Sequence, residues 1–180
     1  MSGATELASL FVQLKRLHAS LSLVDVVTAI DETITNLVGS EDFGVFLRDD
    51  DSREFEKLIA TGTETGALRA FRPGDSSKMG QALASGQIRY GKPVAVVPLR
   101  SGLAADHVGV IVIARLLVHK SGLDASDRAL LDVFAEHAGV ALEAALCARA
   151  GKPTISVRDL RELVGTRSHA GLVGPRGDVS

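Results

Sequence analysis

The side chains that could support catalysis are few and scattered along the chain. There are five histidines, and no two of them stand at a metal-ligand spacing such as His-x-x-x-His. His107 follows Asp106, and such a pair can orient an imidazole for acid–base chemistry, although a loop histidine beside a solvated aspartate is far commoner. Because no nucleophile, base and orienting group can be assembled, we expect no enzymatic activity and no bound metal.

Cys147 is the only thiol, so the chain can form neither an internal disulfide nor an all-cysteine metal site. A single cysteine also fits a reducing compartment. It lies on an apolar stripe near the end of a predicted helix. We therefore interpret it as a small buried hydrophobic residue rather than a redox or attachment site.

Two polar segments invite binding hypotheses. Asp49, Asp50 and Asp51 are consecutive, whereas a calcium loop of the EF-hand type alternates its carboxylates, so we predict a hairpin turn instead. Basic residues around the loop at 62–79 could meet an anionic ligand, but nearby acidic residues offset them, and we expect a solvated loop. The basic residues are Arg69, Arg72 and Lys78, and the acidic ones are Glu64 and Asp75.

Composition excludes several classes of protein. The chain has 180 residues, of which 46% are hydrophobic and 23% charged, so it can bury a core. Its 20 basic and 22 acidic residues nearly balance, which argues against a dedicated binder of nucleic acid or of anionic membranes. No apolar run is long enough for a membrane helix, and the N-terminus lacks the features of a signal peptide. We expect a cytoplasmic protein.

Helices are predicted at both ends of the chain. Leucines at spacings of three and four mark a helix within residues 1–22 that packs either on its own domain or on a second copy. A second helix is expected over 23–38, with Gly39 as its C-terminal cap. A long helix follows Asp124, and its two adjacent apolar stripes form a face too wide for one sheet contact. The first stripe holds Leu131, Phe134, Ala138, Leu142 and Ala145; the second holds Leu130, Val133, Val140, Ala144 and Cys147.

The middle of the chain predicts strands. Runs at 43–47, 53–61, 94–99 and 108–117 are rich in β-prone residues, and a short helix is expected over 76–85. The run at 108–117 has few polar interruptions, which is typical of a strand at the centre of a sheet. This order of elements predicts an α+β domain with one antiparallel sheet.

Several motifs in this order resemble the GAF family, a small-molecule-sensing module of bacterial signalling proteins. The resemblance covers roughly residues 5–150. It rests on the entry helix at 23–38, on Gly80-Gln81-Ala82-Leu83-Ala84-Ser85-Gly86, on Val97-Pro98-Leu99 followed by the strand from Val108, and on the closing helix at 123–148. It implies a GAF-like antiparallel sheet with the N- and C-terminal helices packed on one face. Some family members reduce methionine sulfoxide, but that chemistry needs more than one cysteine.

The chain departs from ligand-binding GAF domains in one segment. Only seven residues separate Gly86 from Val94, where such domains usually have a longer cover, and aromatic residues make up only 4% of the chain. We therefore expect little room for a large buried ligand, and no cofactor. The favoured interpretation is a non-enzymatic regulatory module that homodimerises and acts through a protein partner in signalling. The expected interface consists of Leu7, Leu10, Leu14, Leu17, Phe134, Ala138, Ala141 and Ala145.

The expected organisation is a dimerisation helix at 1–22, a GAF-like domain at 23–150 and a partly disordered tail at 151–180. The tail contains an amphipathic piece that docks either on its own domain or on a partner. The alternative function is a metabolite or nucleotide sensor, with a pocket between the sheet and the loops at 62–78 and 100–107. Its expected lining consists of Phe46, Phe71, Tyr90, Arg100 and His107.

Overall fold

A five-stranded sheet forms the centre of the protein. The computed structural model describes residues 2–103, 105–149 and 156–170. The strands lie in the order β2-β1-β5-β4-β3, and every neighbouring pair is antiparallel. Their bounds are β1 Ser40–Arg48, β2 Phe55–Ala60, β3 Arg89–Tyr90, β4 Ala95–Arg100 and β5 His107–Leu116. The predicted α+β class is confirmed.

Strand β5 lies in the middle of the sheet, as its continuous apolar sequence predicts. Ile111 pairs with Val45 of β1 on one side and with Val97 of β4 on the other. Because successive side chains of a strand point to opposite faces, β5 contributes to two separate cores. Ile111 belongs to the larger core, whereas Val112 belongs to the smaller one.

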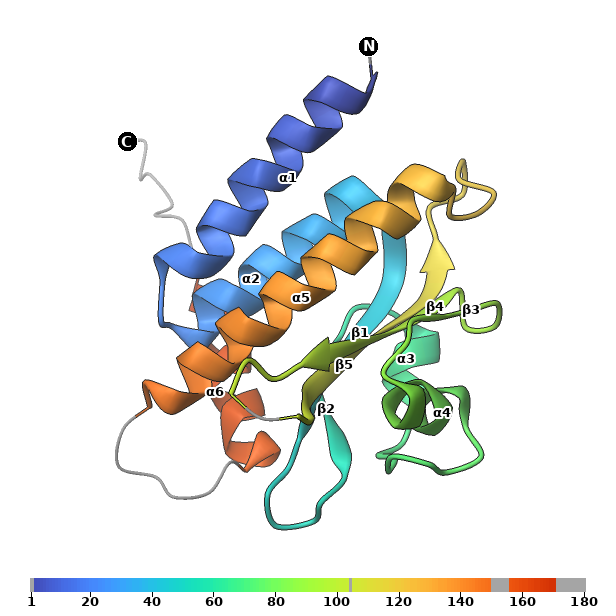
Figure 1. Cartoon of the computed structure of the whole chain (residues 1–180). Coiled ribbons are helices and arrows are strands. Elements are labelled where there is room, and N and C mark those ends of the chain that lie inside the picture. Colours follow the sequence, from blue (N-terminus) through green and yellow to red (C-terminus); the bar gives the residue numbers. More distant parts are fainter. Residues whose placement is uncertain (1, 104, 150–155, 171–180) are drawn as a thin grey trace, which may run out of the picture.

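The helices form layers on the two faces of this sheet (Figure 1). Helices α2 (Leu23–Thr33) and α5 (Ala125–Cys147) cover one face, and α1 (Ser2–Ala19) lies outside them. A short π-helical turn, η1 (Ile34–Val38), ends α2 and leads through Gly39 into β1. The expected packing of the N- and C-terminal helices on one face is confirmed. On the opposite face lie α3 (Thr63–Ala67) and α4 (Lys78–Ser85).

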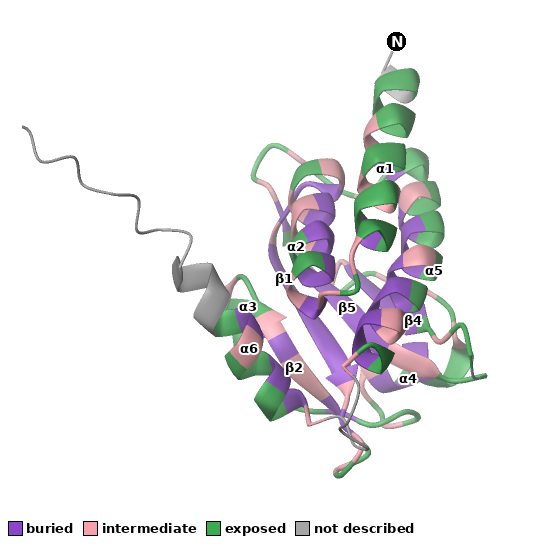
Figure 2. Cartoon of the chain, turned by 90° about the vertical axis from the view of Figure 1, so that its left-hand side faces the viewer, coloured by how far each residue is buried: buried purple, intermediate pink, exposed green. Residues whose placement is uncertain are grey.

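Helix α5 begins at a reciprocal cap and packs closely on the sheet. The Asp124 side chain accepts a hydrogen bond from the Asp127 amide, and the Asp127 side chain accepts one from the Asp124 amide. Further along, Gly139 lies against the backbone of Arg100 in β4, where a side chain would overlap the Arg100 carbonyl oxygen. The sheet strands are mostly buried, whereas α1 is exposed along much of its length (Figure 2).

The amphipathic piece of the predicted tail forms helix α6 (Val157–Ala170), which packs beside β2. The hairpin turn after β1 contacts the first residue of α6. Asp49 accepts a hydrogen bond from the Val157 amide, and it also accepts bonds from the amides of Asp51 and Ser52 within the turn. The aspartate run is therefore a hairpin turn, as predicted, and it also caps α6. Residues 150–155 and 171–180, on which most of the expected disorder falls, lie outside the described residues.

None of the helices in the described part of the chain has the length and hydrophobicity needed to cross a membrane.

Candidate functional site

A pocket of about 670 Å³ opens on the face of the sheet that carries α3 and α4. Its volume lies within the range of about 300–1,000 Å³ that is typical of small-molecule sites. Four segments line it: α3 and the residue after it, the start of α4, the β3–β4 turn, and β5. The lining residues of this α3/α4 pocket are Glu64, Leu68, Lys78, Met79, Gly91, Lys92, Pro93, Val94, Val112 and Ala114.

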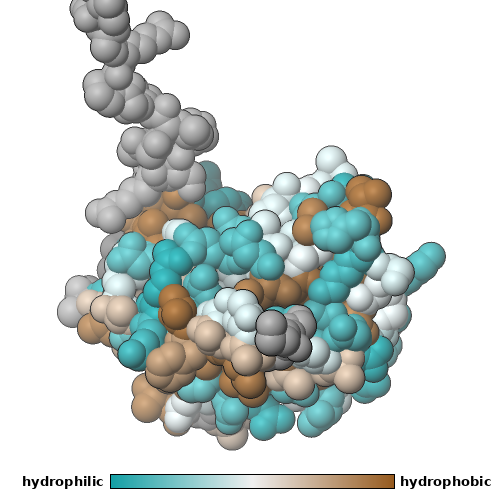
Figure 3. All heavy atoms as spheres, turned by 90° about the horizontal axis from the view of Figure 1, so that it is seen from above, coloured by the Kyte–Doolittle hydropathy of each residue, from teal (hydrophilic) through white to brown (hydrophobic). Residues whose placement is uncertain are grey.

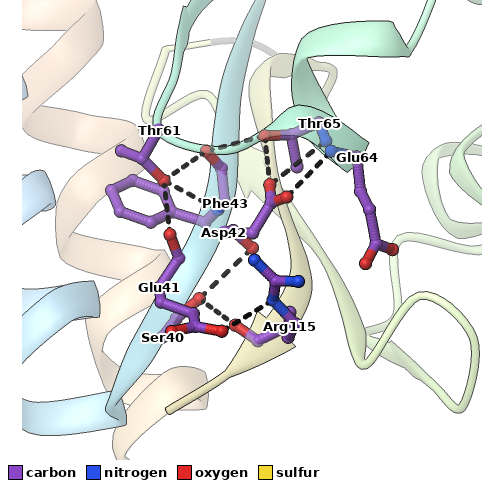
Figure 4. Close-up of polar contacts among 8 residues, drawn as sticks. All are labelled: Ser40, Glu41, Asp42, Phe43, Thr61, Glu64, Thr65 and Arg115. Carbon is purple, nitrogen blue, oxygen red and sulfur yellow. Dashed lines mark hydrogen bonds and ion pairs between the residues drawn. The ribbon is translucent and has the colours of Figure 1, made fainter. Parts of the chain in front are cut away.

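One wall of the pocket, α3, is fixed by a buried carboxylate of β1 (Figure 4). Asp42 has no exposed surface. Its Oδ2 atom accepts a hydrogen bond of 2.8 Å from the Glu64 amide, and its Oδ1 atom accepts bonds of 3.1 Å and 2.6 Å from the amide and hydroxyl of Thr65. These donors stand in the first turn of α3, so Asp42 anchors a helix of only five residues to the sheet.

The charge state of Asp42 follows from these contacts. Burial by itself raises the pKa of this carboxyl, but the hydrogen bonds from Thr65 and Glu64 and the charge of Arg115 together bring the pKa below its ordinary value. Asp42 is therefore ionised at neutral pH. Its negative charge lies at the N-terminal end of α3, where partial positive charge gathers.

The other helical wall, α4, begins at a tight turn. Ser77 caps the helix by accepting a 3.0 Å hydrogen bond from the Gly80 amide. Asp75 accepts hydrogen bonds from the amides of Arg72 and Ser77. Gly80 is required here, because any side chain would overlap Asp75 and crowd the Arg72 carbonyl group. This turn places Lys78 at the first position of α4, on the rim of the pocket.

The β3–β4 turn forms the rim opposite α4. Gly91 has a φ of +132°, a region that favours glycine, and its amide donates to the Val94 carbonyl oxygen at 3.2 Å. The Lys78 ammonium group lies close to this turn, since a Cβ atom built on Gly91 would be 3.0 Å from Nζ. Lys92 is the next residue of the turn. The pocket thus has lysines on two of its rims and apolar side chains between them.

Sequence searches against family models and against curated proteins return no match. Comparison with solved structures returns several GAF domains. One is the GAF domain of an Acinetobacter phosphoenolpyruvate-protein phosphotransferase, with TM-score 0.65 and 12% identity over 85% of this chain and 99% of that one. The corresponding domain from Coxiella burnetii has TM-score 0.64 and 15% identity over 83% and 100%. The chain has a GAF-like fold.

A free methionine-R-sulfoxide reductase from Neisseria meningitidis, solved in complex with its substrate, shares this fold. Its TM-score is 0.58, with 21% identity over 77% of this chain and 89% of that one. In the chain described here the only cysteine, Cys147, is exposed near the end of α5, and it does not line the α3/α4 pocket. The expectation that Cys147 is buried is wrong, because the second apolar stripe of α5 faces outward at that end. No group of three or more metal-ligating side chains is found among the described residues.

The GAF-like domain does not bring the five expected pocket residues together. Phe46 and Phe71 fill the smaller core, with ring centroids 5.1 Å apart, and Phe55 stacks on Phe71. Tyr90 lies on the side of α5, under the guanidinium group of Arg128 at 4.4 Å. None of the five lines the α3/α4 pocket. The five residues therefore do not line one common pocket: Phe46 and Phe71 serve as core, and Arg100 lines a separate pocket beside α5.

Arg100 and His107 form a separate group where β4 ends and β5 begins. They pair across the two strands, and the Arg100 guanidinium donates a hydrogen bond of 3.1 Å to the Gly86 carbonyl oxygen. Burial lowers the pKa of His107; the charge of Asp106 raises it, and that of Arg100 lowers it further. His107 is therefore neutral at physiological pH, and its Nε2 atom is buried without a hydrogen-bond partner among the residues that the structure describes.

Most residues of the expected dimer interface are buried within one subunit. Leu10 and Leu17 pack into the larger core, and Leu14 is partly buried against it. On α5, the small residues Ala138, Ala141 and Ala145 are buried, and the larger Phe134 is buried as well. The buried side chains among them pack within one subunit and present little surface to a second copy, whereas Leu14 is partly accessible. Of the expected interface, only Leu7 is exposed, with 69% of its surface accessible.

An apolar surface remains on the outer side of α1 and α5. Phe11 is 59% exposed on α1, and Val133 and Val140 are 43% and 41% exposed on α5. The two helices are in contact with each other, since the His18 Nε2 and His137 Nδ1 atoms lie 3.0 Å apart. We call Leu7, Phe11, Val133 and Val140 the α1/α5 surface. Seen from above, the molecule shows hydrophobic patches among hydrophilic ones (Figure 3).

Sequence reasoning found part of the α3/α4 pocket and missed the rest. The charges of Glu64 and Lys78 are visible in the sequence as part of the loop at 62–79. Lys92 stands in the short segment between Gly86 and Val94, and no sequence signal marks it as part of a pocket. Leu68, Met79 and Ala114 carry no signal of their own, because half-buried apolar residues are common everywhere.

Proposed function

We propose that the chain is a non-enzymatic regulatory module that binds a small molecule in the α3/α4 pocket. The supporting observation is the pocket, which combines an apolar floor of Leu68, Met79, Val94 and Val112 with a few charged groups at its rim. Such a combination is typical of binding sites for small molecules. Among the described residues, the lining holds no serine, threonine, cysteine, tyrosine or histidine, so we propose binding rather than turnover.

The sheet offers a physical route from the pocket to the helices. Val112 of β5 faces the pocket, while its neighbours Ile111 and Ile113 belong to the core under α2 and α5. A ligand that shifts β5 therefore acts on the packing of α5 as well. We propose that a change at the α1/α5 surface carries the signal onward to a protein partner.

Filling the pocket should abolish ligand binding. Ala114 is half-buried on β5 and lines the pocket, so Ala114→Leu is expected to weaken binding at least tenfold by occupying the ligand's space. The measurement is the thermal shift of the purified protein against a panel of neutral, cationic and anionic metabolites. Ala84→Leu, on the exposed side of α4, is the matched control and should respond like the unmodified chain. Equal responses from both variants would contradict a site in this pocket.

The second proposed function is homodimerisation through the α1/α5 surface. The supporting observation is that four large apolar side chains on two adjacent helices are exposed in the single subunit. Contiguous exposed apolar surface is a common mark of protein interfaces. A second copy of the same surface fits it by symmetry, since a two-fold interface presents the same patch from both partners.

A charge in the centre of this surface should prevent dimer formation. Phe11→Asp would bury an unpaired carboxylate in the interface, so we expect the dissociation constant to rise at least a hundredfold. Sedimentation velocity over a range of concentrations measures it. Val118→Asp is the control, because Val118 is 96% exposed and lies outside α1 and α5. A monomeric unmodified chain, or a Phe11→Asp variant that still dimerises, would rule this proposal out.

A further inference from the structure

Two lysines at the rim of the α3/α4 pocket have no partner in the described part of the chain. Lys78 and Lys92 are both exposed, and neither makes a hydrogen bond or an ion pair with any described residue. They come from different segments, the start of α4 and the β3–β4 turn. The fold brings them to one opening although 14 positions separate them in the sequence (92 minus 78).

Two carboxylates on this side of the sheet accept hydrogen bonds from backbone amides. Asp42 is bonded to the first turn of α3, and Asp75 to the turn before α4. Glu64 is the one carboxylate in the pocket lining. Two lysines against one glutamate leave the lining with a net charge of +1 (2 minus 1). The first turn of α4 adds the partial positive charge of a helix N-terminus on the same side as Lys78.

We propose that the α3/α4 pocket takes a small organic anion with an apolar body. Its carboxylate or phosphate group lies between Lys78 and Lys92, and its apolar part lies on Leu68, Met79 and Val112. A single net positive charge suits a carboxylate or a phosphate monoester better than a polyphosphate. This inference rests on the proposed function, because it names the class of ligand for the same site.

The conformation of the β3–β4 turn leaves space for the Lys78 ammonium group beside Gly91. Gly91 leaves room for Lys78 Nζ, and a side chain at position 91 would displace it or be strained by the positive φ. The ammonium group of this exposed lysine thus lies beside the β3–β4 turn, at the rim of the pocket. An anion placed there gains charge-assisted hydrogen bonds, which are stronger than bonds between neutral groups.

Isothermal titration calorimetry with four probes tests this inference on the full chain. The probes are hexanoate, hexyl phosphate, inorganic phosphate and the neutral hexanamide. We expect hexanoate or hexyl phosphate to bind at least tenfold more tightly than both hexanamide and inorganic phosphate, since only these two combine charge and apolar body. Whichever of them binds more tightly identifies the headgroup. Raising the salt concentration should weaken the binding of the anions and leave the binding of hexanamide unchanged.

Variants assign the effect to the two lysines. Lys78→Gln and Lys92→Gln should each weaken anion binding about tenfold, and the double variant should bind hexanoate no better than hexanamide. Lys15→Gln removes a lysine from α1, on the opposite side of the sheet, and should leave anion binding unchanged. Because the Lys15 ammonium group stacks on Phe11, the stability of this control is measured separately. Lys78 and Lys92 are exposed, so the unfolding curves of their variants should be unaltered, and this is checked first.

The outcomes separate this inference from the proposed function. If hexanamide binds as tightly as the anions, or if the double lysine variant retains anion binding, the ligand class is wrong. In that case binding that Ala114→Leu abolishes would still support a sensor. If no neutral, cationic or anionic compound binds in a manner sensitive to Ala114→Leu, the proposed function itself fails, and this inference with it.

Discussion

Gly139→Ala should destabilise the protein by about 1–2 kcal/mol, although the same change stabilises most helices. A Cβ atom at this position would overlap the carbonyl oxygen of Arg100 and lie 3.0 Å from its amide nitrogen. Both obstacles are backbone atoms of β4, so no side chain can move aside, and α5 must lift from the sheet. Overpacking of this kind costs about 1–3 kcal/mol or more, which exceeds the gain of about 1 kcal/mol in helix propensity.

The chain contains a matched control for this prediction. Gly165 is an exposed residue within α6, and a Cβ atom there would have no neighbour within 4 Å. Gly165→Ala should therefore stabilise the protein, or at least α6, by about 0.5–1 kcal/mol. Urea denaturation of the two variants beside the unmodified chain measures both free energies of unfolding. A gain in stability for Gly139→Ala would show that α5 does not rest on β4 as described.

Asp42→Asn should lower the free energy of unfolding by about 3 kcal/mol at neutral pH. The carboxylate accepts three hydrogen bonds, one from Glu64 and two from Thr65. The amide group of asparagine has only one oxygen, so its NH2 group would face at least one of these three donors. A buried donor left without its acceptor costs about 1–3 kcal/mol, and hydrogen bonds to a charged group are the stronger ones. Because Asp42 anchors α3, this variant should also weaken ligand binding in the α3/α4 pocket.

The same substitution should change how stability depends on pH. The pKa of Asp42 is lower in the folded chain than in the unfolded one, where it is about 3.9. The contribution of the Asp42 carboxylate to the free energy of unfolding is therefore complete above that value, and it is lost as the pH falls through the folded pKa. Asp42→Asn should make the decline of stability below about pH 5 shallower. The decline should not vanish, because the pKa values of Asp49 and Asp75 are also lowered.

Asp51→Asn is the control for the acid measurements. Asp51 lies exposed in the turn after β1, and only its backbone amide takes part in the Asp49 contact. Urea denaturation at a series of pH values from 2 to 8 should give the same pH profile for Asp51→Asn and the unmodified chain. A profile for Asp42→Asn that matches the unmodified chain would show that the buried carboxylate does not account for acid sensitivity.

Local sequence predicts most elements of this fold. The capped run at 23–38, the cap at Asp124 and the β-prone run at 108–117 each correspond to an element of the structure, because capping and periodicity act over a few residues. The GAF-like arrangement, which the resemblance to that family implies, is confirmed by the likeness to solved GAF domains. The π-helical end of α2 is not predicted, and the separate cap of α6 by Asp49 depends on a contact across 108 positions.

Sequence by itself determined which sides of the helices and strands are apolar, and hence the α+β architecture. Only the tertiary structure decided what covers each side. Leu17 and Leu7 belong to the same leucine seam, yet Leu17 is fully buried in the larger core and Leu7 is 69% exposed. The N-terminal end of α1 projects beyond the rest of the helical layer (Figure 1). The α3/α4 pocket was decided in the same way. Its residues come from four segments whose meeting depends on long-range strand pairing, and periodicity within a segment carries no information about which segments meet.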